Sequence, residues 1–137
     1  MFITQTEFLH SPKPITILSL RGELDATNYH VVINQAKQLY DEGTRNLLID
    51  LSDLVFMASS GLVALHIAAK IMRGESIPQT NGNCMHAIAD DIDMRTSPER
   101  HCKLLKPQRR IQKTLDTTGF STILQIYQDR DAAIASF

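Results

Sequence analysis

The chain has 137 residues, of which 43% are hydrophobic, and this is enough apolar material for the core of one domain. Its formal net charge of −1 argues against bulk electrostatic binding to nucleic acid or to an anionic membrane. No apolar run reaches the roughly 18 residues that a membrane span needs. The two cysteines, with no secretion signal, indicate a reducing compartment. We therefore expect one cytoplasmic domain over residues 1–137.

The chain opens with two predicted strands. Phe2–Leu9 alternates in the manner of a strand, and a turn over 10–13 leads to a mostly apolar strand over 15–20, which together predict a hairpin. A helix follows, with Asp25 or Thr27 as its candidate cap and Gly43 as its stop. The continuous apolar run over 46–51 is typical of a strand that is buried on both faces.

Residues 59–73 predict a helix that is apolar almost all round. A narrow polar stripe on it contains His66, Lys70 and Arg73 and, one turn back, Ser59, whereas Ser60 projects toward the apolar side. We expect a largely buried helix whose water-facing stripe runs up to Ser59.

The pattern then disappears over 74–101, where prolines, glycines and small polar residues leave no clear period. A loop of this length in a compact domain is commonly functional or disordered. We interpret the segment as a flexible insertion, with a short helix over 86–94 as an alternative for part of it.

Regular patterns return in the last third of the chain. A strand is predicted over 102–106, a helix from Pro107 to Gly119, a strand over 121–127, and a helix that Asp129 caps. The alternation predicts an α/β fold: a mixed, mainly parallel sheet of four or five strands with about four helices.

No common catalytic motif is present, since phosphate-binding loops, dinucleotide fingerprints, zinc-protease helices and nucleophile elbows are all missing. Ser59 and His66 are separated by roughly 10 Å of helical rise, too far to share a proton. We expect no catalytic residues, although a pocket that joins Ser59 to a carboxylate or histidine would favour an enzyme.

Three polar clusters have simple explanations. Cys84, His86, His101 and Cys102 match no familiar zinc spacing, and the last two point in opposite directions on a strand. An acidic cluster, formed by Asp90, Asp91 and Asp93, lacks the glycine and terminal glutamate of a calcium loop. A basic cluster lacks the interleaved aromatic residues of a single-strand nucleic-acid site; it contains Lys106, Arg109, Arg110 and Lys113. We expect no metal and no cofactor, and we interpret both charged clusters as solvated surfaces.

The segment 56–62 places two hydroxyls and a glycine where a buried strand leads into a helix. One interpretation is a plain N-cap, in which a serine accepts a backbone N–H bond. The other is a modification site, because the positive end of a helix tolerates an anion. A phosphate on Ser59 adds about −1.5 to −2 charges and would break an interface built for a neutral tip.

The run over 50–62, Asp-Leu-Ser-Asp-Leu-Val-Phe-Met-Ala-Ser-Ser-Gly-Leu, resembles the signature of STAS domains, specifically bacterial anti-sigma factor antagonists. Gly22–Asp25 resembles an early motif of that family, and Thr118–Phe120 resembles its Ser-Gly-Leu element near the C-terminus. The resemblance covers most of 1–73 and 102–137. Ala58 departs from it, since the family usually has Asp before the first serine.

The resemblance implies a partner-switching module. The unphosphorylated antagonist binds an anti-sigma factor that is also a GHKL-type serine kinase, and phosphorylation releases it; a PP2C-type phosphatase reverses the change. The family's phosphoserine falls on Ser59, with Ser60 as second choice. The partner-binding residues expected from it are Asp25, Ala58, Ser59, Ser60, Gly61, Leu62, Val63 and His66. A constitutive scaffold or ligand-sensing STAS module, not regulated by a kinase, remains the alternative. We expect no direct contact with nucleic acid or membrane.

Overall fold

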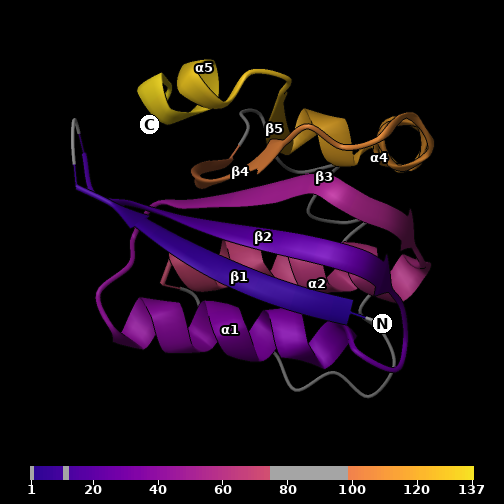
Figure 1. Ribbon diagram of the computed structural model, residues 1–137, viewed down its shortest axis with the longest axis horizontal. Helices are drawn as coiled ribbons and strands as arrows, with labels where there is room; N and C mark the ends of the chain where they lie inside the picture. The colour runs from indigo at the N-terminus through magenta and orange to yellow at the C-terminus, as the bar shows by residue number, and fades with distance from the viewer. Residues whose placement is uncertain (1, 11–12, 75–98) are drawn as a thin grey trace.

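Five strands and four α-helices form the described part of the chain in a computed structural model, which describes residues 2–10, 13–74 and 99–137 (Figure 1). The strands are β1 (Phe2–Leu9), β2 (Ile15–Leu24), β3 (Leu47–Met57), β4 (Glu99–Leu105) and β5 (Leu124–Tyr127). The helices are α1 (Tyr29–Asp41), α2 (Ser59–Met72), α4 (Arg109–Thr118), α5 (Arg130–Ala135) and the 3₁₀ turn η1 (Phe120–Thr122). The predicted α/β fold class is confirmed.

The strands form one sheet in the order in which they occur along the chain. β1 pairs antiparallel with β2 as the predicted hairpin, and β2, β3, β4 and β5 pair in parallel. A parallel neighbour requires a crossover, and α1 and α4 supply the connections from β2 to β3 and from β4 to β5. The carboxyl ends of the parallel strands therefore share one edge of the sheet.

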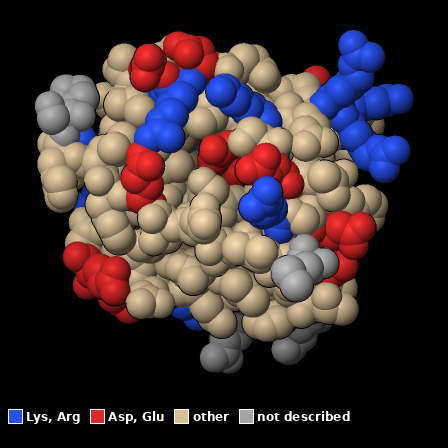
Figure 2. Space-filling view, in the orientation of Figure 1, with Lys and Arg blue, Asp and Glu red and all other residues tan. Residues whose placement is uncertain are grey.

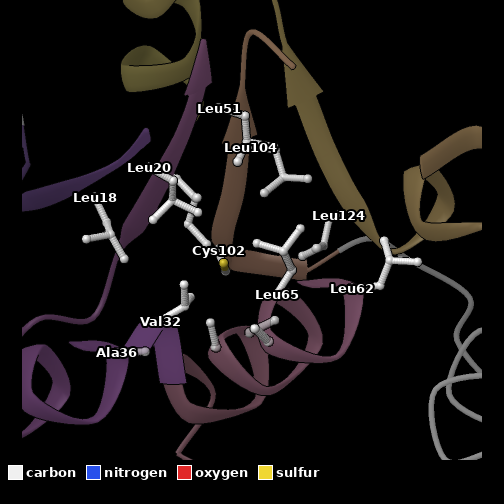
Figure 3. Packing of buried hydrophobic residues seen from close by; sticks show 14 of the residues in the cluster. Leu18, Leu20, Val32, Ala36, Leu51, Leu62, Leu65, Cys102, Leu104 and Leu124 are labelled. Atoms are coloured by element: carbon white, nitrogen blue, oxygen red, sulfur yellow. The ribbon is translucent and has the colours of Figure 1, made fainter. Parts of the chain in front are cut away.

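The two faces of the sheet are covered unequally. On one face, α1 and α2 lie against the strands, and α4 adds Ile111 and Leu115 to the same large cluster. Figure 3 shows Leu65 of α2 directed toward Cys102 and Leu104 of β4. Among the described residues, the opposite face carries α5 and a small cluster of buried residues: Ile15, Ile17, Leu48, Leu105 and Ala133.

β3 explains why a continuous apolar run forms a central strand. Leu47, Leu48 and Ile49 are all fully buried, because odd and even positions face different covered sides of the sheet. The strand is longer than the predicted 46–51 and continues to Met57. Among the described strands, the last residues of β3 pair with β2 alone, because β4 pairs with β3 only as far as Asp50.

The predicted insertion lies mostly outside the described residues, as does the alternative helix over 86–94. Gly74, at a φ of 80°, follows the end of α2. The predicted boundary at 101 is wrong, because β4 already begins at Glu99. Across the described ranges, no helix is long and apolar enough to cross a membrane.

Candidate functional site

The N-terminus of α2 lies where β3 ends, at the carboxyl edge of the parallel sheet. Met57 closes β3 opposite Leu24, the last residue of β2. The next N–H, that of Ala58, donates to the Leu24 carbonyl over 2.8 Å, and α2 begins at Ser59. One backbone hydrogen bond thus fixes the start of α2 against the end of β2.

Ser59 and Ser60 differ in how far solvent reaches them. Ser59 is exposed, as predicted. Ser60 Oγ is shielded from solvent and, in the part of the chain that the structure describes, has no hydrogen-bond partner. The interpretation of a serine as N-cap is wrong, because Ala58 occupies that position and no side chain caps the helix. The Ser59 hydroxyl therefore does not cap α2.

The predicted water-facing stripe on α2 is wrong in one place. His66 is only 4% exposed and stands edge-on to Phe120, with ring centroids 6.3 Å apart. Leu62 and Val63, expected as contacts for a partner, are also buried, at 2% and 8% exposure. The cause is tertiary: α2 packs against α1, β3 and β4, so neighbours cover flanks that a helical projection leaves open.

Gly61 is required by packing at the start of α2. Its N–H donates to the Ala58 carbonyl over 2.9 Å. A Cβ at this position would overlap Met57 and stand 3.1 Å from the Leu24 side chain, closer than ordinary packing allows. The glycine therefore brings the first turn of α2 close to the ends of β2 and β3.

Asp25 belongs to a hydrogen-bonded turn after β2 rather than to a helix cap. Its Oδ1 accepts from the Thr27 N–H over 2.9 Å and from the Thr27 hydroxyl over 2.6 Å. These two bonds hold the pKa of the Asp25 carboxyl below its usual value. The N-cap of α1 is Asn28, so the sequence-based choice of Asp25 or Thr27 is wrong. Asn28 fixes the turn through its side chain, which contacts the backbone of both Glu23 and Asp25.

Two exposed apolar residues lie immediately before the site, and sequence reasoning missed them. Val55 is 52% exposed and Phe56 is 40% exposed, although both belong to β3. They lie on the part of β3 that extends beyond β4. The signal in the sequence is the run 54–57, which is apolar without alternation just before a helix start. Together with Ser59 and the Asp25 turn, they make up the surface that we call the α2 tip.

The other predicted clusters do not form sites among the described residues. His101 is exposed and Cys102 fully buried, so the expectation that they point in opposite directions is confirmed. No group of metal-ligating side chains occurs in the described ranges, and Cys84, His86, Asp90, Asp91 and Asp93 lie outside them. The four basic residues from Lys106 to Lys113 are all exposed, and Figure 2 shows basic side chains gathered over α4.

The order of motifs at this edge of the sheet has a counterpart in known proteins. The family model of the STAS domain matches residues 9–78, from the hairpin through α2. The chain belongs to the STAS domain family. The part of the domain that carries the α2 tip thus lies within the matched range, while β4, α4, β5 and α5 complete the STAS fold beyond it.

Solved structures share the whole STAS fold at low sequence identity. An anti-sigma factor antagonist from Mycobacterium paratuberculosis aligns at a TM-score of 0.71 and 16% identity, covering 99% of this chain and 93% of that one. A putative antagonist from Thermotoga maritima aligns at 0.66 and 17%, covering 96% and 92%. The phosphorylated Bacillus cell fate determinant SpoIIAA aligns at 0.58 and 19%, covering 97% of each chain. No curated protein matches the sequence.

Proposed function

We propose that this STAS domain is an anti-sigma factor antagonist and that phosphorylation of Ser59 switches its contact with the anti-sigma factor. The observation that carries the proposal is the contrast between Ser59, which is exposed, and the residues that follow it in α2, most of which are buried. A kinase reaches the hydroxyl without any part of the core opening. The similar structures, which include an anti-sigma factor antagonist and the phosphorylated form of SpoIIAA, support the same role.

The fold tolerates a phosphate at this position. The first N–H groups of an α-helix lack intrahelical acceptors, and the helix dipole favours negative charge at that end. Because no side chain caps α2, phosphorylation of Ser59 removes no capping bond. The group adds about −1.5 to −2 charges to the surface while the apolar face of α2 stays packed. The modification therefore acts on a partner rather than on stability.

The α2 tip has the composition of an interface. Val55 and Phe56 present apolar surface on the end of the strand that leads into Ser59, and aromatic residues are common anchors of protein interfaces. The hydrogen-bonded Asp25 turn supplies a fixed acidic neighbour. An anti-sigma factor that covers this surface when Ser59 is neutral meets a desolvated dianion after phosphorylation, and that costs binding free energy. Leu62, Val63 and His66, which are buried, then support the α2 tip by packing beneath it and do not contact the partner.

This proposal involves two enzymes. One is a GHKL-type serine kinase, which is also the anti-sigma factor, and the other is a PP2C-type phosphatase. Ala58 stands where the family usually has an acid, so this tip lacks one carboxylate before the modified serine. We propose that recognition by the kinase relies here on Val55, Phe56 and the Asp25 turn instead. The chain itself performs no catalysis in this scheme.

The test incubates the purified full chain with labelled ATP and a GHKL-type serine kinase from the same organism. Ser59→Ala should keep binding and lose phosphate incorporation, whereas Ser59→Asp should weaken kinase binding about tenfold or more. Ser60→Ala is the matched control and should be labelled like the wild type, because its hydroxyl is enclosed. Equal labelling of the wild type and Ser59→Ala rejects the site, and full binding by a chain that never takes phosphate indicates a constitutive scaffold.

A further inference from the structure

Helix α4 presents a basic face to solvent on the same side of the molecule as the start of α2 (Figure 1). Its buried side chains, Ile111 and Leu115, attach it to the large core cluster. At about 100° per residue, its three cations fall within one arc on the opposite side of the helix. With the lysine that precedes the helix, they form what we call the α4 basic face: Lys106, Arg109, Arg110 and Lys113. All of them are exposed, and Figure 2 shows basic side chains projecting there.

The charges of the α4 basic face are not balanced within the domain. Across residues 2–10, 13–74 and 99–137, none of its side chains takes part in an ion pair or a hydrogen bond. The acidic residue of α4, Asp116, accepts instead from Gln112 Nε2 over 2.9 Å. A local excess of positive charge therefore faces solvent, in a chain whose formal net charge is −1. Such an excess attracts a partner whose own surface is negative.

The two arginines of this face stand where a helix favours acidic residues. Gln108 is the N-cap of α4, so Arg109 and Arg110 are the first two residues of the helix, and its first turn contains no acid. The positive end of the helix dipole repels cations at these positions. The arginines therefore weaken α4 slightly, and a residue that acts against local stability is typical of a functional surface.

The α4 basic face lies within reach of a partner that is bound to the α2 tip. Gln108 Nε2 donates to the Ser52 carbonyl over 3.0 Å, which fixes the start of α4 beside β3. Ser52 precedes Phe56 by four residues, or about 13 Å of extended strand. A protein interface of standard size covers about 800 Å² on each partner, a patch roughly 30 Å across. An interface centred on Phe56 therefore extends to the first turn of α4.

We propose that the anti-sigma factor that covers the α2 tip also contacts the α4 basic face, through an acidic surface of its own. This inference rests on the proposed function and adds the chemistry of the partner. Val55 and Phe56 supply the apolar centre, and the arginines supply a charged rim of the kind that steers association. Nucleic acid is the less suitable partner, because α4 has no aromatic residue on which a base could stack and the chain as a whole is not basic.

The experiment measures the association and dissociation rates of the full chain with a GHKL-type serine kinase from the same organism, at low and high ionic strength. ADP replaces ATP, so that Ser59 stays unmodified. Arg109→Glu and Arg110→Glu should each slow association about tenfold at low ionic strength and much less at high ionic strength, with little change in dissociation. Neither variant should lower the midpoint of thermal unfolding, because glutamate suits the first turn of a helix. A loss of binding by these variants thus cannot come from unfolding.

The matched control is Lys37→Glu, which makes the same change in net charge at an exposed residue of α1 and should alter the association rate less than twofold. An equal loss by this control means that net charge alone sets the rate, and it overturns the inference. Unchanged rates for both arginine variants, while Ser59→Asp still weakens binding, overturn the inference and leave the proposed function standing. If the wild type does not bind the kinase at all, both fail. Unchanged kinase rates with arginine-dependent binding of a DNA duplex would assign the face to nucleic acid instead.

Discussion

The two faces of the sheet differ in how completely helices and buried apolar side chains cover them. In the part of the chain that the structure describes, the face that carries α2 is covered by α1, α2 and α4 and holds the large core cluster, including fully buried residues from every strand except β1. The α5 face has a helix of six residues, a cluster of five buried residues and a buried lysine. The first face gives Ser59 a rigid support, while the second has few apolar contacts to resist local opening.

This difference shows where chemical change is tolerated. A charge added at Ser59 stays outside a core that extends along nearly all of α2. A charge change at Lys103 acts on its hydrogen bonds to Ser136 and on its contact with the Phe137 ring, just after the end of α5. The exposed ion pair between Arg130 and Glu7 also fastens α5, to β1, but exposed pairs contribute little to stability.

The largest expected effect is on the α2 face. Leu65→Ala removes a side chain that is fully buried in the large cluster and should lower the free energy of unfolding by about 2–5 kcal/mol. Ile134→Ala, on α5 and only partly buried, should cost about 1 kcal/mol. Urea unfolding of both variants measures the difference. Equal losses would show that the two faces are equally important for stability.

The next effect concerns the first turn of α2. In an open helix, Gly61→Ala would add about 1 kcal/mol of stability. Here the Cβ meets Met57 and Leu24, and overpacking of this kind costs about 1–3 kcal/mol. We expect a net loss of about 1 kcal/mol in thermal or urea unfolding. Ser59→Ala, at the exposed neighbour, should change stability by less than about 0.5 kcal/mol. A stabilised Gly61→Ala would contradict the close approach.

A smaller effect is expected at the start of α5. Asp129 caps this helix by accepting from the Ala132 N–H over 3.0 Å. Asp129→Ala should cost about 0.5–1 kcal/mol, the lower part of the range for lost caps, because the site is exposed. Hydrogen exchange should speed up in 130–135 and stay unchanged in α2. Faster exchange in both helices would mean that the two faces open as one unit.

The smallest expected effect is a change in the pKa of the Asp25 carboxyl. Thr27→Val removes the hydroxyl that donates to Asp25, so the pKa of that carboxyl should rise toward 3.8. Because the folded-state pKa lies below the unfolded value, this contribution to stability is present above pH 3.8 and is lost as the pH falls through the folded pKa. Carbon NMR of the carboxyl measures the shift. Thr117→Val, on α4, is the control and should leave the Asp25 titration unchanged.

Local sequence patterns were sufficient to predict the order of the strands and helices and the exposed position of Ser59. Alternation identified the hairpin, the apolar run over 46–51 identified a strand buried on both faces, and the helical period placed α2 within one residue of its observed end. The exposure of Ser59 followed from the same projection. These features depend on neighbours in sequence, and so a single chain contains enough information to predict them.

Sequence patterns did not predict the features that depend on residues far apart along the chain. The burial of His66 depends on Phe120, which is 54 positions away, and the exposure of Phe56 depends on where β4 stops. Lys103 looked like an ordinary strand residue. Only the return of the chain after α5 places Ser136 and Phe137 over it and turns its ammonium into a buried charge. The sequence determined which faces are apolar; the tertiary structure decided which polar groups they enclose, because enclosure depends on the packing of segments far apart along the chain.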